Sequence, residues 1–313
     1  MLTAGLTAGL TVEGLGARTL AQRLRGPGLR LQTGPFVACV RSPLPALART
    51  LGHMYADYPV LDEQALADFN VLLTGASGLR RFIKPQVRFH FDGMTPFQPL
   101  PLSQAFPMFE WAMNWCVSSQ AHSWLVIHAA VVEKEGAAVI LPAPPGSGKS
   151  TLCAALVARG WRLLSDELTL VRPGDGRIDP LPRPVSLKNG SIDVIRAWAP
   201  AAELSPPVLD TLKGTVAHMR VPGASVARAG EPATPAWIVF PKWRAGAAAE
   251  LVPVAQARAH LRLAENAFNY SLLGATGFAA AARLIEGTRT FDFSYGALDD
   301  AMSVFERLLA GRR

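Results

Sequence analysis

Cysteine is scarce in this sequence, and its few cysteines form no pattern. The chain has three among 313 residues, Cys39, Cys116 and Cys153. They are far apart, odd in number and include no C-x-x-C pair, which argues against a disulfide framework and a zinc site. This usage is typical of a reducing compartment, and we expect a cytoplasmic protein.

Charged residues are also few, at 18%, and no dense run of lysine or arginine occurs although the net charge is +7. A basic chain can bind nucleic acid, a membrane surface or a polyanionic ligand. Because the cations are dispersed, the sequence favours a solvated surface with a basic nucleotide cleft. We therefore expect no nucleic-acid partner.

Long uncharged runs are missing too, so the sequence predicts no membrane span and no membrane partner. Residues 1–16 are apolar but lack the basic start and the cleavage site of a signal peptide. Internal repeats and low-complexity tails are absent from the sequence. With half of its residues hydrophobic, a chain of this length can bury a sizeable core, and two lobes are expected.

The first part of the chain predicts a small α+β lobe over residues 1–105. Strands are expected at 29–32, 35–40 and 86–91, the last of which alternates and ends in an Asp-Gly turn. A helix is expected at 63–73. The proline-rich stretch 96–107 reads as a boundary, and a second domain is expected over 106–313.

The second domain opens on an aromatic-rich helix over 108–123, which we interpret as core. Strands and helices follow it, and the expected fold class is α/β. Strands are expected at 125–132, 137–141, 162–165, 168–171 and 236–240. Helices are expected at 149–159, ended by Gly160, at 254–285 with a break near Gly274, and at 299–309.

A glycine-rich turn lies between an apolar strand and a helix, in the stretch LPAPPGSGKST at 141–151. Glycines there let backbone N–H groups turn inward around phosphate oxygens, and the helix N-terminus adds partial positive charge. Lys149 would place a point charge at the β- and γ-phosphates, and the Ser150 hydroxyl can ligate Mg²⁺. The predicted phosphate-binding residues are Gly146, Ser147, Gly148, Lys149, Ser150 and Thr151.

The loop departs from the usual G-x-x-x-x-G-K-[ST] pattern at its first position, which is Ala143. Alanine is small enough to be accommodated where φ is negative. The alternative is an accidental glycine-rich turn between a strand and a helix, which the flanking elements make the weaker interpretation.

Asp166 and Glu167 follow the next strand, at the carboxyl end where open α/β sheets bind their ligands. A carboxylate there can deprotonate an acceptor hydroxyl or hold Mg²⁺ through water; a pair of solvated turn acids is the alternative. His128 interrupts the strand before the loop strand, where a satisfied core histidine is the usual interpretation. Arg183, Lys188 and Lys213 could bring a cation to the transferred group, or be ordinary surface cations.

Taken together, these residues resemble the HPr kinase/phosphorylase family. The shared order is a histidine on a strand, a P-loop and an Arg-Gly-x-Arg-Leu stretch that ends in paired acids, met here by His128, by 146–151 and by 159–167. The chain is more closely similar to the HPr-kinase-related kinases of type A. That likeness is carried by 33–36, 109–111, 114–115, 127–130, 161–167, 183–189, 213–215 and 266–270.

The resemblance implies a P-loop kinase core of HPr-kinase type, a mixed sheet with flanking helices, that uses ATP and Mg²⁺. It implies Asp166 as the base for the acceptor hydroxyl, Lys149 as a catalytic cation and His128 as a pocket residue. Ser150 and Glu167 are the metal-ligand candidates. Type A members resemble enzymes encoded beside small peptide-carrier proteins, which implies a peptide or small-protein acceptor. HPr kinases assemble as hexamers, so a homo-oligomer is a further expectation.

Some family features are absent from the sequence. The second acid is Glu167 where the family has Asp, no metal-binding Glu is evident near Ser186, and Lys188 stands where an Arg is typical. The C-terminal signature of the reverse reaction is missing, so neither HPr nor phosphorylase activity is carried over. A small-molecule kinase and a non-catalytic nucleotide switch remain alternatives; the lack of an Asn-Lys-x-Asp motif weakens a GTPase switch.

Overall fold

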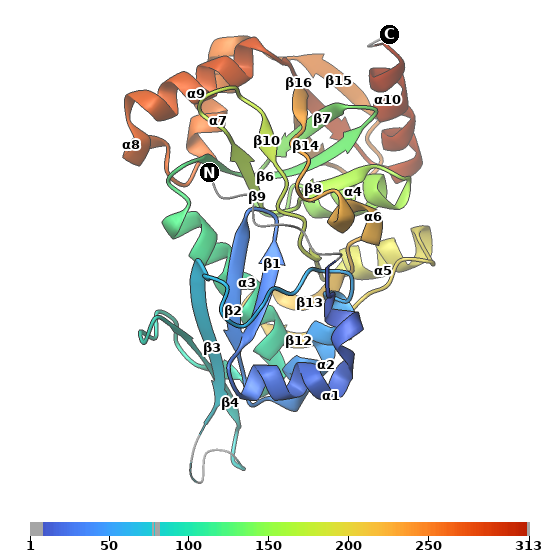
Figure 1. Ribbon diagram of the computed structural model, residues 1–313. Helices are drawn as coiled ribbons and strands as arrows, with labels where there is room; N and C mark the ends of the chain where they lie inside the picture. The colour runs from blue at the N-terminus through green and yellow to red at the C-terminus, as the bar shows by residue number, and fades with distance from the viewer. Residues whose placement is uncertain (1–8, 77, 79–81, 312–313) are drawn as a thin grey trace. The chain divides into compact units, whose positions relative to one another are not determined.

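The computed structural model describes residues 9–76, 78 and 82–311 (Figure 1). They form mixed sheets and helices of the α/β type, in two compact units. The first unit comprises Met1–Met113 with Val208–Leu212, and the second comprises Asn114–Pro207 with Lys213–Arg313. The predicted domain boundary after residue 105 stays a prediction.

The first unit is built on a five-stranded sheet of order β1-β2-β3-β4-β5, in which β2 and β3 are parallel and the other pairs antiparallel. Two helices, α1 and α2, pack on each other. The elements are α1 (Val12–Arg25), β1 (Leu29–Thr33), β2 (Phe36–Arg41), α2 (Pro45–Met54), β3 (Phe69–Gly75), β4 (Gln86–Phe91), β5 (Leu100–Pro101), the short η2 (Leu102–Gln104), most of α3 (Ala105–Gln120), and β12 (Val208–Thr211).

The helix predicted at 63–73 is wrong, because residues 63–68 form turns and irregular structure and strand β3 begins at Phe69. Phe69, Val71 and Leu73 alternate with less buried residues and pack into the sheet core. β3 pairs with both β2 and β4, so tertiary pairing decides the conformation of a segment whose local pattern is ambiguous. The three strands predicted in this unit are confirmed as β1, β2 and β4.

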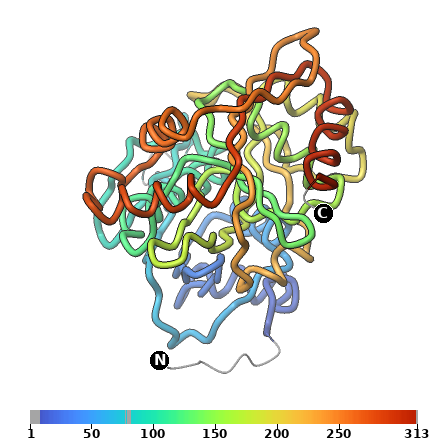
Figure 2. The backbone as a smooth tube through the Cα atoms, turned by 90° about the horizontal axis from the view of Figure 1, so that it is seen from above, coloured from blue at the N-terminus to red at the C-terminus, as the bar shows by residue number. Residues whose placement is uncertain are grey.

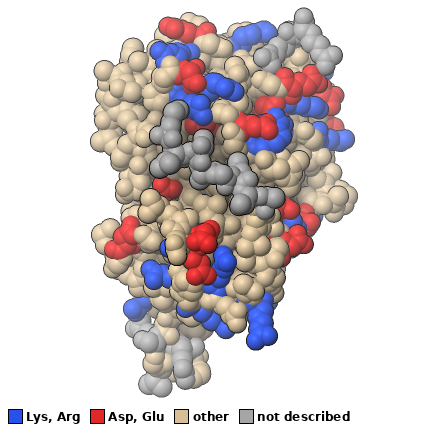
Figure 3. Space-filling view, viewed as in Figure 1, with Lys and Arg blue, Asp and Glu red and all other residues tan. Residues whose placement is uncertain are grey.

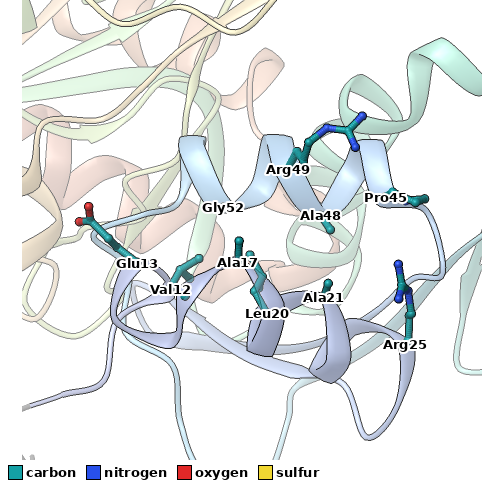
Figure 4. Close-up of a pocket in the computed structure, with 11 residues that line it drawn as sticks. Val12, Glu13, Ala17, Leu20, Ala21, Arg25, Pro45, Ala48, Arg49 and Gly52 are labelled. Carbon is teal, nitrogen blue, oxygen red and sulfur yellow. The ribbon is translucent and has the colours of Figure 1, made fainter.

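A cavity of about 390 Å³ lies between α1 and α2 (Figure 4). Small residues on both helices, among them Ala17, Ala48 and Gly52, leave this space open, and Arg25 and Arg49 stand at its rim. None of the predicted site residues lines it. The candidate site described below therefore does not depend on this hollow.

The second unit contains a sheet of order β10-β9-β6-β7-β14-β16-β15, with β8 also paired to β6. A small antiparallel ladder joins β11 to β13. The strands are β6 (Leu125–Lys134), β7 (Ala137–Pro142), β8 (Arg162–Ser165), β9 (Leu168–Val171), β10 (Ile178–Asp179), β11 (Val185–Lys188), β13 (Gly214–Met219), β14 (Thr234–Trp243), β15 (Glu250–Pro253) and β16 (Arg289–Tyr295).

Helices cover both faces of this sheet. One face packs against α7 and α9 through an apolar core that includes Leu263 and Leu284, while α4 and α10 lie on the other (Figures 1 and 2). The helices are α4 (Lys149–Ala158), α5 (Gly190–Trp198), α6 (Gly223–Ala227), α7 (Gln256–Glu265), α8 (Tyr270–Leu273), α9 (Ala275–Glu286) and α10 (Leu298–Ala310). The break predicted near Gly274 is confirmed.

Three neighbouring parallel strands of the second unit end at the same edge of its sheet. β7 runs parallel to β14, and β14 runs parallel to β16, so their carboxyl ends meet at one edge of the sheet. In α/β sheets this is the edge at which ligands bind. The chain leaves β7 at Pro142 and enters α4 at Lys149, which places the predicted phosphate loop at that edge.

Charged side chains of both signs are interspersed over the face seen in Figure 3. This distribution agrees with the dispersed cations of the sequence. Among the residues that the structure describes, no helix has the length and apolarity needed to cross a bilayer.

Candidate active site

The loop between β7 and α4 has the backbone shape that its glycines allow. Gly146 and Gly148 have φ values of 84° and 88°, in the left-handed region that glycine adopts without strain. Gly148 is also required for steric reasons, because a Cβ at this position would lie 2.5 Å from the hydroxyl of Tyr295. The loop is therefore fixed both by its own conformation and by its neighbours.

Several backbone amides of this loop have no internal partner. Ser147 N–H donates to the carbonyl of Pro144 at 3.3 Å. The amides of four loop and first-turn residues donate to no group in the described part of the chain; they are Gly146, Gly148, Ser150 and Thr151. Unpaired N–H groups at the start of a helix, with its positive dipole end, form a natural site for an anion.

The carbonyls of the same loop are held from outside. The backbone N–H of Trp243, the last residue of β14, donates to Ser147 O at 2.8 Å. The hydroxyl of Tyr295, the last residue of β16, donates to Gly148 O at 3.0 Å. Two neighbouring strands thus anchor the oxygens of the loop, while several of its N–H groups stay unbonded.

Lys149 lies among acids at the first turn of α4. Its side chain is 7% exposed, and its Nζ lies 3.8 Å from Asp166 Oδ1 and 3.8 Å from Glu167 Oε2. The ammonium also donates to the backbone carbonyl of Asp166. Burial alone would lower the pKa of Lys149, but the charges of Glu167 and Asp166 outweigh it and raise that pKa. The lysine is therefore fully charged at neutral pH.

Asp166 is buried where the chain passes from β8 to β9. Its Oδ2 accepts from the backbone N–H of Ser186 at 3.1 Å, and the Ser150 hydroxyl bonds to the same carboxylate. Its Oδ1 is buried and has no hydrogen-bond partner within the described ranges. Burial and the charge of Glu167 raise the pKa of Asp166 against the opposing effect of Lys149. A raised pKa and a free oxygen suit a group that accepts a proton.

Glu167 lies against two lysines and a histidine. Its carboxylate lies 2.9 Å from His128 Nε2, 3.8 Å from Lys149 Nζ and 4.0 Å from Lys188 Nζ. Burial alone would raise the pKa of Glu167, but Lys149, His128 and Lys188 together lower it below the ordinary range. Glu167 is therefore ionised at neutral pH and is the anion that Lys149 and Lys188 share.

His128 is part of this cluster and not an isolated core residue. Its backbone N–H donates to Asn266 O at 2.7 Å, which fixes this part of β6. Its ring meets the edge of Phe268, with centroids 6.0 Å apart, and its side chain is 24% exposed. The pocket role that the family resemblance implies for His128 stays a prediction.

The other predicted cations, Lys188, Lys213 and Arg183, differ in their surroundings. Lys188 contacts Glu167, and Lys213 lies within electrostatic reach of both, since burial and then Lys188 lower the pKa of Lys213. Arg183 is buried and donates to Asn114 Oδ1 at 2.7 Å. Trp243 and Tyr295 were not predicted, because neither lies in a recognisable motif.

Residues that suit Mg²⁺ are present at the mouth of the loop. Mg²⁺ prefers oxygen ligands and retains several waters, so one or two protein oxygens suffice. The Ser150 hydroxyl, which lies in the first turn of α4 and bonds to the buried Asp166 carboxylate, fits that requirement. The described residues contain no cluster of three His, Cys, Asp or Glu side chains that could form a closed metal cage. Glu167 lies against Lys149, Lys188 and the His128 ring, and its role as a ligand stays a prediction.

Comparisons with known proteins give limited further information. Residues 104–197 match the model of a family described as SynChlorMet cassette protein ScmC, a stretch that contains the loop and both acids. A search of curated proteins finds no match. A solved structure, the Hpr(Ser) kinase/phosphatase from Coxiella burnetii, is similar at 12% identity and a TM-score of 0.27, over 59% of this chain and 98% of the other. These values are too low to transfer a function to this chain.

Proposed function

We propose that this chain is an ATP-dependent kinase of the HPr-kinase type, which transfers the γ-phosphoryl group to a hydroxyl of a peptide or small protein. The observation that carries the proposal is the cluster around Lys149. A charged lysine, unpaired loop amides and a buried acid with a free oxygen meet at the carboxyl edge of the sheet. Phosphoryl transfer needs these parts, namely a phosphate cradle, a cation and a proton acceptor.

Binding of the triphosphate would change the partner of Lys149. Without nucleotide, its ammonium is neutralised by Asp166 and Glu167. The β- and γ-phosphates carry more negative charge and would lie against the loop amides beside the same ammonium. Lys149 then shares its charge with the phosphates, while Glu167 keeps His128 and Lys188 as partners.

Asp166 would serve as the base. The acceptor oxygen forms a bond to the γ-phosphorus, the bond from that phosphorus to the bridging oxygen breaks, and ADP leaves. The proton of the acceptor hydroxyl would pass to Asp166 Oδ1, the oxygen that accepts no hydrogen bond from a described group. The Ser150 hydroxyl would hold Mg²⁺, which neutralises phosphate charge when bound, and Asp166 Oδ1 is left for the proton. The contacts of Glu167 with His128 and Lys149 would hold these side chains in position.

The nature of the acceptor rests on the resemblance to type A kinases. It supports a serine or threonine of a peptide or of a small peptide-carrier protein, in a cytoplasmic and homo-oligomeric enzyme. The competing functions are a small-molecule kinase and a nucleotide switch without transfer. The buried free oxygen of Asp166 favours transfer, because a protein that only binds nucleotide has no need of a base.

The test is a labelling experiment with purified protein, Mg²⁺, γ-labelled ATP and cell extract, followed by mass spectrometry of the labelled species. Wild type should label a serine or threonine. The Asp166→Asn variant should bind ATP as the wild type does but transfer on the order of 10² times more slowly. Asp300→Asn, an exposed acid in the first turn of α10, is the matched control and should transfer normally. Wild-type transfer by Asp166→Asn would remove the base assignment.

A further inference from the structure

A nucleotide whose phosphates lie on the 146–151 loop needs a surface for its base, and the structure offers one at the neighbouring strand. β7, β14 and β16 are parallel, and their carboxyl ends lie side by side at the ligand-binding edge. Trp243 is the last residue of β14. It therefore stands next to the loop along the edge on which the rest of a nucleotide can extend.

Trp243 is in direct contact with the phosphate loop. Its backbone N–H donates to Ser147 O at 2.8 Å. Its Cβ lies 2.8 Å from the position that a Cβ on Gly148 would take. The side chain thus starts within van der Waals distance of the loop glycine.

The indole is held in place and yet remains open. Its Nε1–H donates to the carbonyl of Gly296 at 3.1 Å, which fixes the ring orientation. The residue is 50% exposed. Within the described residues no aromatic ring or cation stacks on it. A large, rigid and half-exposed aromatic side chain at a ligand-binding edge has the character of a binding platform.

We propose that the Trp243 indole is the stacking platform for the purine base of the bound nucleotide. This inference rests on the proposed function, since it needs a nucleotide on the loop. Every base presents a π-face, so a fixed indole can hold it without hydrogen-bond readout. The loop then binds the phosphate tail, and Trp243 binds the other end of the same molecule.

The experiment separates the two ends of the ligand by using two probes. Isothermal titration in Mg²⁺ measures the Kd of the non-hydrolysable imido analogue of ATP and the Kd of inorganic tripolyphosphate, which has the tail but no base. The proteins are wild type, Trp243→Ala, Trp243→Phe and Trp198→Ala. Trp198 is a matched control, because its indole stacks on Arg159 on another part of the same unit.

Trp243→Ala should weaken the ATP analogue by about 5- to 150-fold, the range that base–aromatic stacking spans in alanine substitutions. Its affinity for tripolyphosphate should not change, because alanine retains the backbone N–H that bonds to Ser147 O. Trp243→Phe should recover most of the lost affinity, and Trp198→Ala should bind both probes as wild type does.

Two results would overturn the proposal while leaving the phosphate site intact. In the first, Trp243→Ala binds the ATP analogue as tightly as wild type. In the second, the Trp243→Ala substitution weakens the affinity for both probes by the same factor. The indole would then support the loop and would not bind the base. If wild type binds neither probe, the proposed function fails, and the platform fails with it.

Discussion

Replacing Lys149 by methionine should destabilise the second unit even before any nucleotide is added. The side chain is 7% exposed, and its Nζ lies 3.8 Å from Asp166 Oδ1 and 3.8 Å from Glu167 Oε2. Methionine keeps the length and volume of the side chain but removes the charge that both acids share. Asp166, at 3% exposure, would then be ionised in the interior without its cation.

The size of the effect follows from burial. Removing one partner of a buried ion pair costs about 3–5 kcal/mol. We take the lower end, about 3 kcal/mol, because Glu167 is 23% exposed and keeps His128 and Lys188. In a unit of about 200 residues, 1 kcal/mol shifts Tm by roughly 2–4 °C, so Tm should fall by roughly 6–12 °C.

The stability lost in Lys149→Met should be larger at high pH than at low pH. Without the cation, the folded-state pKa values of Asp166 and Glu167 rise, since Lys149 lowers both in the native protein. A carboxyl whose folded pKa is raised destabilises the fold above that pKa, and the penalty disappears as the pH falls through it. The Tm gap between wild type and Lys149→Met should therefore be widest near pH 8 and should narrow toward pH 5.

Differential scanning calorimetry across this pH range measures the gap. Lys242→Met is the matched control, because Lys242 is exposed on β14 and its loss should change stability by less than about 0.5 kcal/mol. Adding Mg·ATP at 100 times its Kd should stabilise wild type by about 2.7 kcal/mol and leave Lys149→Met unchanged. A Lys149→Met variant as stable as the control at pH 8, or one that ATP still stabilises, would refute the reasoning.

Three further substitutions probe other parts of the site. Glu167→Gln removes a charge that raises the pKa of Asp166, so the acid limb of the kcat/KM profile should move to lower pH; an unmoved limb would show that Asp166 is not the titrating base. His128→Ala should lower turnover while changing Tm little, whereas a large fall in Tm with normal specific activity would indicate a core-packing role. Gly148→Ala should abolish nucleotide binding in a titration, because its φ of 88° and the nearby tyrosine hydroxyl exclude a Cβ. Gly136→Ala, with positive φ but open space, should cost only the backbone strain of about 1–2 kcal/mol and bind normally.

The local parts of the site could be predicted from the sequence because their signals are contiguous. A buried strand, two glycines and a helix follow one another within 137–158, and the structure confirms the strand as β7 and the helix as α4. Asp166 and Glu167 follow β8 directly, so a short return of the chain brings them to the loop. His128 needed the family resemblance, because a single histidine on an apolar strand carries no signal of its own.

The residues that hold the loop from outside could not be predicted. Tyr295 contacts Gly148 across 147 positions of sequence, and Trp243 reaches Ser147 only because β14 and β7 are neighbours in the sheet. Strand order depends on long-range packing, which one sequence does not encode in any local pattern. Only the folded chain shows that the ends of β14 and β16 meet the loop.

One other expectation shows where local reasoning is weakest. The stretch 63–73 has a composition compatible with a helix, yet β2 and β4 select a strand over Phe69–Gly75. The partners that decide its conformation lie outside the segment itself.

Hydrogen exchange of the loop peptide over 143–151, measured by mass spectrometry with and without the imido analogue of ATP, tests the central claim most directly. The amides of Gly146, Gly148, Ser150 and Thr151 have no partner within the described chain, so they should exchange rapidly in the free protein. Phosphate oxygens would bond to them and slow their exchange by roughly tenfold or more, as expected for bonds worth about 1.4 kcal/mol or more each. Unchanged exchange at a saturating concentration of the analogue would contradict the account.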